Sequence, residues 1–66
     1  MAEENKENIL TVLKEAYPGD LSIGEVAQRS LLSRGTASTW LKVLKAEDKI
    51  ELSRKVGPAV FYRVKK

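Results

Sequence analysis

Apolar residues in the first third of the chain recur every three or four positions, which is the spacing of one face of an α-helix. The run extends from Ile9 to Tyr17, and it predicts a first helix over residues 3–16. Pro18 ends this helix, because proline has no amide hydrogen to donate and disfavours helix at the residue before it. Three early glutamates then occupy the positive end of the helix dipole, so they are interpreted as helix-start residues rather than as a binding site.

A second, shorter helix is predicted over residues 23–30. Ser22 and Glu25 have the S-x-x-E spacing of a capping box, in which the serine accepts a bond from the third helical residue and the glutamate reaches back. The inward positions of this helix include Ala27, whose small side chain allows close approach by another helix. Leu31 and Leu32 then interrupt the helical period.

Residues 34–47 form the third predicted helix, with Ser33 as its cap. The apolar positions Ala37, Leu41 and Leu44 fall on one face. Trp40 falls near the same face, so its indole is expected to pack in the core rather than to stack on a nucleic-acid base. The first turns of this helix are rich in hydroxyl side chains, although serine and threonine are mediocre helix formers. Their presence indicates that these side chains contact something polar outside the helix.

Residues 50–64 are rich in β-branched and aromatic residues around a Gly-Pro-Ala segment and predict a β-hairpin. A three-residue loop would place Val56 opposite Val60, and Leu52 opposite Val64. This register keeps the aliphatic residues together, whereas a loop one residue longer or shorter would split them. It leaves the following side chains on the outer face: Ser53, Lys55, Phe61 and Arg63.

Sixty-six residues suffice for a single small domain, predicted to span residues 1–66. The chain has no Cys and no His, so neither a disulfide nor a usual metal site is expected, and no cofactor is expected either. No apolar run approaches the length that spans a membrane, and the polar, acidic start does not resemble a signal peptide. These features predict a soluble cytoplasmic protein.

Charge is distributed unevenly along the chain. Residues 1–20 carry two lysines against five carboxylates, a net charge of −3, whereas residues 34–66 carry nine cations against three carboxylates, a net charge of +6. A basic second half favours an anionic partner. Scattered solubilising lysines would give the same count, so charge alone leaves both readings open.

The order of helix, short helix, turn, helix and basic hairpin resembles the winged helix-turn-helix family. The resemblance rests on the stretch LSIGEVAQRSLLSRGTASTWLKVLKAEDKIE and on the tail GPAVFYRV, which is similar to the second wing strand of small prokaryotic and archaeal transcriptional regulators. It implies an α+β fold with three helices and a two-stranded wing. Two positions depart from the family: Leu31 replaces a frequent glycine in the turn, and Asp48 replaces one after the third helix.

The resemblance implies that the third helix enters the major groove of double-stranded DNA and that the wing contacts a neighbouring groove or the backbone. The candidate base-edge residues are Arg34, Thr36, Ser38 and Thr39. Ser33 and Gly35 lie at the helix start, and Lys42 and Lys45 are expected on the phosphate backbone. The wing candidates are Arg54, Lys55 and Arg63.

The predicted function is therefore sequence-specific DNA binding by a transcriptional regulator. Two alternatives remain open: a winged-helix module that binds protein in a transcription or replication assembly, and a chromatin-like protein that coats DNA without sequence choice. A second copy of the chain is an expected partner, with Tyr17, Val43 and Phe61 as candidate contacts, and no small-molecule effector is expected. An enzyme is not expected, because Glu47, Asp48 and Glu51 have no nucleophile or histidine beside them.

Overall fold

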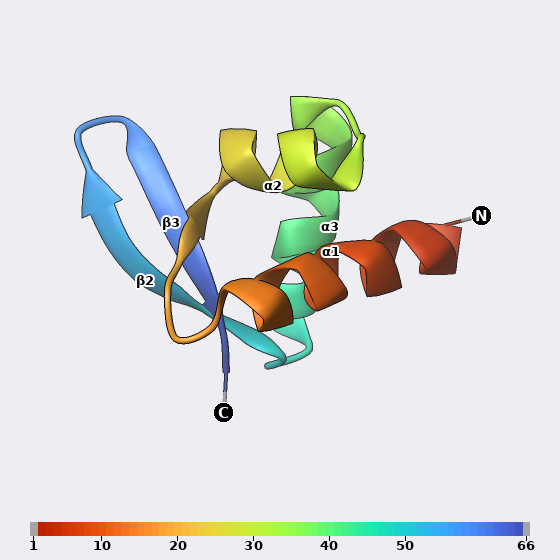
Figure 1. Ribbon diagram of the computed structural model, residues 1–66, viewed down its shortest axis with the longest axis horizontal. Helices are drawn as coiled ribbons and strands as arrows, with labels where there is room; N and C mark the ends of the chain where they lie inside the picture. The colour runs from red at the N-terminus through yellow and green to blue at the C-terminus, as the bar shows by residue number, and fades with distance from the viewer. Residues whose placement is uncertain (1, 66) are drawn as a thin grey trace.

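Three helices and a small antiparallel sheet build the fold of this computed structural model, which describes residues 2–65 and the side chains of residues 4–65. The elements in chain order are α1 (Ala2–Ala16), β1 (Leu21–Ser22), α2 (Ile23–Ser30), α3 (Arg34–Ala46), β2 (Ile50–Val56) and β3 (Ala59–Val64). The β2–β3 hairpin projects from the helices as a wing (Figure 1). The predicted α+β winged-helix arrangement is confirmed.

Both predicted helix caps are present. The Ser22 Oγ accepts a hydrogen bond from the Glu25 amide at 3.3 Å, and the Glu25 carboxylate accepts one from the Ser22 amide at 3.0 Å, which completes the capping box of α2. Ser33 caps α3 by accepting a bond from the Thr36 amide at 3.2 Å. The sequence therefore specifies where both helices of the helix-turn-helix begin.

The turn between α2 and α3 depends on a left-handed residue that is not glycine. Leu31 has φ 59° and is 91% exposed, so the leucine bears the steric cost of this conformation without burying its side chain. Its amide still closes the end of α2 by donating to carbonyls of the last turn. Asp48, with φ 67° after α3, adopts the same conformation, as expected for a short polar side chain.

Replacing Leu31 with glycine is expected to stabilise the fold by about 1 kcal/mol, because glycine adopts positive φ without a steric penalty. The free energy of unfolding, measured by urea denaturation, checks this value. Leu31→Ala is the matched control, since it removes the exposed side chain and retains the penalty, and it should change stability by less than about 0.5 kcal/mol. A destabilised Leu31→Gly variant would show that the leucine side chain supports the turn.

The sheet has three strands in the order β1-β3-β2, all antiparallel. The two-residue strand β1, which the sequence did not predict, pairs Leu21 with Tyr62. Alone, two residues give no alternation pattern to recognise. The strand exists because the chain passes beside β3 on its way from α1 to α2.

The predicted hairpin register is wrong. Val56 lies opposite Ala59, so the loop has two residues, Gly57 and Pro58, rather than three. Gly57 has φ +57°, and a glycine at the first position of a two-residue loop is typical of the turns that match the twist of paired strands. An irregularity at Ser53 then shifts the register, so that Leu52 opposes Tyr62. This bulge keeps the apolar residues paired despite the shorter loop.

The corrected register also changes which residues share a face of the wing. Tyr62 is buried against the helices, and directly paired residues lie on the same face. Lys55 pairs with Val60 and lies on this helix-facing side, not on the predicted outer face. Arg54 pairs with Phe61 and lies on the outer face, where Arg63 lies opposite Glu51.

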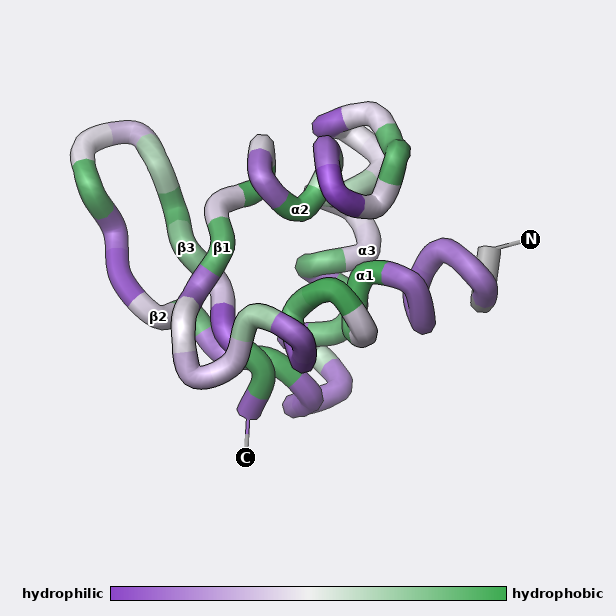
Figure 2. Tube along the Cα trace, in the orientation of Figure 1, coloured by the Kyte–Doolittle hydropathy of each residue, from purple (hydrophilic) through white to green (hydrophobic). Residues whose placement is uncertain are grey.

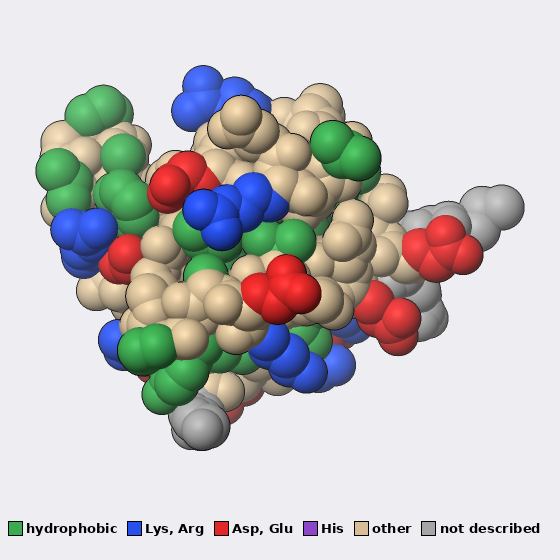
Figure 3. Space-filling model, in the orientation of Figure 1, with side chains coloured by type: hydrophobic (Ala, Val, Ile, Leu, Met, Phe, Trp, Pro, Cys, Tyr) green, Lys and Arg blue, Asp and Glu red, His purple; other side chains and the backbone are tan. Residues whose placement is uncertain are grey.

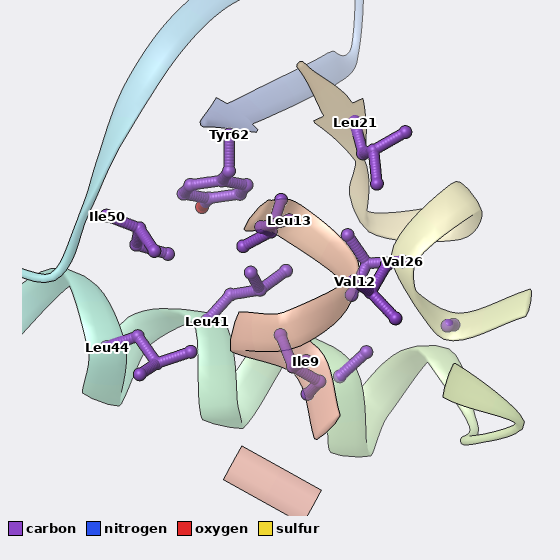
Figure 4. Packing of buried hydrophobic residues seen from close by; sticks show 11 residues of the cluster. Ile9, Val12, Leu13, Leu21, Val26, Leu41, Leu44, Ile50 and Tyr62 are labelled. Carbon is purple, nitrogen blue, oxygen red and sulfur yellow. The ribbon is translucent and has the colours of Figure 1, made fainter. Parts of the chain in front are cut away.

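The core lies between the three helices and the base of the wing (Figure 4). Ile9, Leu13, Leu41 and Leu44 are fully buried, and Ile50 and Tyr62 close the cluster from the sheet. Trp40 packs against this cluster from the side, as predicted. No helix within residues 2–65 is both long and apolar enough to cross a membrane. Hydropathy along the chain follows this division, with polar residues in the first turns of α1 and apolar residues where α1 crosses the core (Figure 2).

Candidate nucleic-acid interface

One face of α3 packs on the core and the opposite face is open. Ala37, Leu41 and Leu44 are buried, and the residues on the opposite stripe are exposed: Gly35, Thr39, Lys42 and Ala46. Their spacing of four, three and four places them in one line along the helix. The Thr39 hydroxyl donates to the Gly35 carbonyl at 3.0 Å, so its lone pairs face outward as acceptors. The first helical turns therefore present small and polar side chains to solvent.

A groove runs between α3 and the wing. Its lining comes from three segments, namely Ser22–Gly24 at the start of α2, Arg34, Gly35 and Ser38 of α3, and Pro58–Val60 of the wing, and its volume is about 340 Å³. We call it the α3–wing groove. Lys55 is next to it, on the same face of the wing as Val60. Two predicted DNA-binding elements, the third helix and the wing, thus border one hollow.

Arg34 is directed into this groove by its contact with Gly24. A β-carbon at position 24 would lie 3.1 Å from an Arg34 Nη atom and 3.6 Å from its Cζ. The guanidinium therefore lies against the first turn of α2, and a larger residue at position 24 would require the Arg34 side chain to shift slightly. Arg34 thus lines the α3–wing groove rather than the open stripe of α3.

The hydroxyls at the start of α3 are partly used within the chain. The Ser33 Oγ donates to the Thr36 Oγ1 at 2.9 Å while it accepts the Thr36 amide. Thr36 and Ser38 are half-buried, and only Ser38 of these two lines the groove. Of the predicted hydroxyl residues, Thr39 and Ser38 are thus placed best to meet an external partner.

Cations of the chain divide into two groups by their partners. Arg34, Lys42, Lys45 and Lys55 border α3 and its groove, and none of them has a carboxylate partner within residues 4–65. Five other cations are paired with carboxylates: Lys6 and Lys49 with Glu47, Arg54 with Asp20, Arg63 with Glu51, and Lys65 with Asp48. Lys14 on α1 and Arg29 on α2 also lack a carboxylate partner within residues 4–65. Four of the six described cations without a carboxylate partner therefore border α3 and its groove, and the other two lie on α1 and α2.

Arg54 is held on the outer face of the wing. Its Nε donates to Asp20 Oδ2 at 2.9 Å, Ser53 donates to the same oxygen at 2.8 Å, and its guanidinium lies 4.4 Å from the centre of the Phe61 ring. The hydrogen bond from Arg54, with a second from Ser53, lowers the pKa of the Asp20 carboxyl from its ordinary value. Arg54 is thus separated from the α3–wing groove by the thickness of the sheet.

Arg63 is likewise placed away from the other candidates. Its Nη2 donates to Glu51 Oε2 at 2.7 Å, and this bond raises the pKa of the Arg63 guanidinium. The Arg63–Glu51 pair lies on the outer face of the sheet, as Arg54 does. This face is turned away from the helices. Of the three predicted wing residues, the structure brings only Lys55 together with α3.

The carboxylates that follow α3 are engaged as ion-pair partners. Glu47 accepts a 2.6 Å bond from the Lys6 ammonium, which lowers the pKa of the Glu47 carboxyl. Asp48 accepts a 2.7 Å bond from Lys65. A general acid at neutral pH needs a raised carboxyl pKa, and the shift at Glu47 has the opposite direction. These groups tie the end of α3 to α1 and to the C-terminal end of β3.

Sequence reasoning missed Gly24 and the wing-tip residues Pro58–Val60 as parts of the surface. No local pattern marks them, because they meet α3 only through the tertiary fold. The comparisons with known proteins found no family model that matches the chain and no curated protein that matches it. The geometry therefore carries the functional argument.

Proposed function

We propose that the protein binds double-stranded DNA in a sequence-specific way, as a transcriptional regulator of the winged helix-turn-helix class. The observation that carries the proposal is the concentration of unpaired cations, Arg34, Lys42, Lys45 and Lys55, around one open helix and the groove beside it. DNA is the anionic partner whose major groove admits one α-helix. Such a regulator would act in the cytoplasm.

Each part of the surface has a role in this proposal. The stripe of Gly35, Thr39 and Lys42 would enter the major groove, with Thr39 at base edges and Lys42 further along the helix. Arg34 and Lys55 would hold one phosphate strand from the two sides of the α3–wing groove, since cations that contact the backbone fix the register of a protein on the duplex. Lys45 would contact the same strand, because helical spacing puts it on the flank of α3 that carries Arg34 and Ser38.

Binding rather than catalysis is the favoured activity. The carboxylates nearest α3 are held by lysines, and the lowered pKa of Glu47 makes its carboxyl a poor proton donor at neutral pH. The serines that open α2 and α3 serve as helix caps. The residues of the surface thus match a contact with an anion and offer no activated nucleophile within residues 4–65.

A salt titration with a duplex chosen by selection from random sequences tests the proposal. If the four unpaired cations each neutralise one phosphate, the logarithm of the binding constant should fall against the logarithm of salt concentration with a slope of about −3.5 for each chain. Fluorescence anisotropy of a labelled duplex measures the slope. An unrelated duplex should bind at least about 1,000-fold more weakly.

Two outcomes would redirect the function. A steep slope with equal affinity for selected and unrelated duplexes would assign the protein to the class that coats DNA without sequence choice. No binding to any duplex at low salt would remove DNA as the partner and favour the module that binds protein. In either case the selected sequence motif would be absent.

A further inference from the structure

A second hollow lies near the C-terminal end of α3, away from the α3–wing groove at its start. It is formed by two adjoining depressions of about 310 and 390 Å³ along the last turns of α1, and both are bordered by Lys14, Val64 and Lys65. Leu10 extends it in one direction and Tyr17 in the other. We call it the α1–β3 groove. Figure 3 shows apolar and basic side chains side by side along this lower edge of the molecule.

The groove combines an apolar floor with an unneutralised cation. Leu10 and Val64 are only partly buried, and Tyr17 is 37% exposed. Lys65 is bonded to Asp48, whereas Lys14 has no carboxylate partner within residues 4–65. An occupant that complements this surface needs an apolar side chain and, beside it, a carboxylate.

The chain itself carries such an occupant. Glu7, Leu10, Lys14 and Tyr17 follow one another at spacings of three, four and three, so they form a single stripe along α1. Glu7 is exposed and has no cation partner within residues 4–65. The stripe is acidic toward its N-terminal end and basic toward its C-terminal end. Its charges are therefore complementary to those of the same stripe on a second copy that runs antiparallel.

We propose that two copies of the chain associate through antiparallel packing of their α1 helices across the α1–β3 grooves. With a two-fold axis midway between Leu10 and Thr11, Glu7 of each copy lies level with Lys14 of the other, because the two residues are equally distant from the axis along the helix. Leu10 of the second copy then covers the exposed apolar floor. Parallel packing would instead oppose like charges at both positions.

Figure 1 shows the last turns of α1 and the C-terminal end of β3 near the lower edge of the molecule, away from the wing tip. Asp48 and Lys49, which follow α3, border the α1–β3 groove. Among the residues that the structure describes, this groove shares no lining residue with the α3–wing groove. The inference rests on the charge pattern of α1 and does not depend on DNA binding.

Charge-reversal variants of the full chain test the interface. Their association is measured by sedimentation equilibrium in the absence of DNA. The wild-type chain is expected to dimerise, and Glu7→Lys or Lys14→Glu should each raise the dimer dissociation constant by about tenfold or more, since each reversal creates two repulsive pairs. The double variant Glu7→Lys/Lys14→Glu should return to within about threefold of wild type, because the pairs are attractive again.

A mixture of the two single variants gives a sharper result. In a heterodimer of Glu7→Lys with Lys14→Glu, both cross-helix pairs are attractive, so the mixture should associate about tenfold or more tightly than either variant alone. Glu15→Lys is the matched control, because it makes the same charge change on an exposed residue of α1 outside the stripe. Far-UV circular dichroism verifies that each variant is folded.

Three results would overturn the interface. They are a wild-type chain that stays monomeric up to millimolar concentration, a dimer that Glu7→Lys leaves unchanged, and a double variant that remains as weak as the single ones. Because DNA is absent from the experiment, none of these results bears on the proposed DNA binding.

Discussion

Leu41→Ala is expected to lower the free energy of unfolding by about 2 to 5 kcal/mol. Leu41 is 0% exposed and lies at the centre of the cluster between α1, α3 and the sheet (Figure 4), so alanine leaves a cavity that the surrounding side chains fill only in part. A domain of 66 residues has a total stability of about 3 to 10 kcal/mol. Urea denaturation followed by circular dichroism measures the loss.

The effect should be specific to burial rather than to leucine. Leu31→Ala removes the same atoms from a side chain that is 91% exposed and should change stability by less than about 0.5 kcal/mol. A Leu41→Ala variant as stable as Leu31→Ala would mean that α3 is held by something other than its apolar face. Burial of the apolar face would then no longer explain why the opposite face of α3 is exposed to solvent.

Lys42→Ala/Lys45→Ala is expected to weaken binding to a selected duplex by about 10- to 100-fold at low salt and to reduce the magnitude of the salt slope by about 2. Both lysines are exposed on α3, and neither has a carboxylate partner within residues 4–65. Their removal would delete the proposed phosphate contacts without disturbing an internal ion pair within residues 4–65. Anisotropy titrations at several salt concentrations measure both quantities.

Arg54→Ala/Arg63→Ala is the matched control, because it removes the same charge from the outer face of the wing. Each arginine is bonded to a carboxylate there, so affinity should fall by less than about threefold and the slope should stay unchanged. A loss equal to that of the lysine pair would show that charge count, not position, controls binding. The proposed division between paired and unpaired cations would then be wrong.

The helices of this fold were predictable because their signals are local. The capping box at Ser22 and the cap at Ser33 act within one helical turn, and the apolar spacing of α3 is set by the helical repeat. The hairpin was predictable as an element but not in its register. A bulge at Ser53 compensates for the two-residue loop, and no sequence pattern reveals where a strand inserts one extra residue.

The candidate surface was predictable in part. The placement of Gly35, Thr39, Lys42 and Lys45 on α3 follows from helical geometry and the apolar face opposite. Arg54 and Lys55 lie on the faces opposite to those predicted, because the loop has two residues rather than three. Adjacent strand residues point to opposite faces, so a difference of one residue in the loop moves each of the two side chains to the other face.

The amino-acid sequence by itself determined which segments become helices, where two of them begin, and which face of α3 is buried, because these properties depend on neighbours within a few residues. Only the tertiary structure decided which cations form ion pairs with carboxylates and which have no such partner. That outcome depends on carboxylates distant in sequence, as Asp20 is from Arg54 and Glu47 is from Lys6. Ion pairs act over a few ångströms in space, and it is the fold that brings such residues together.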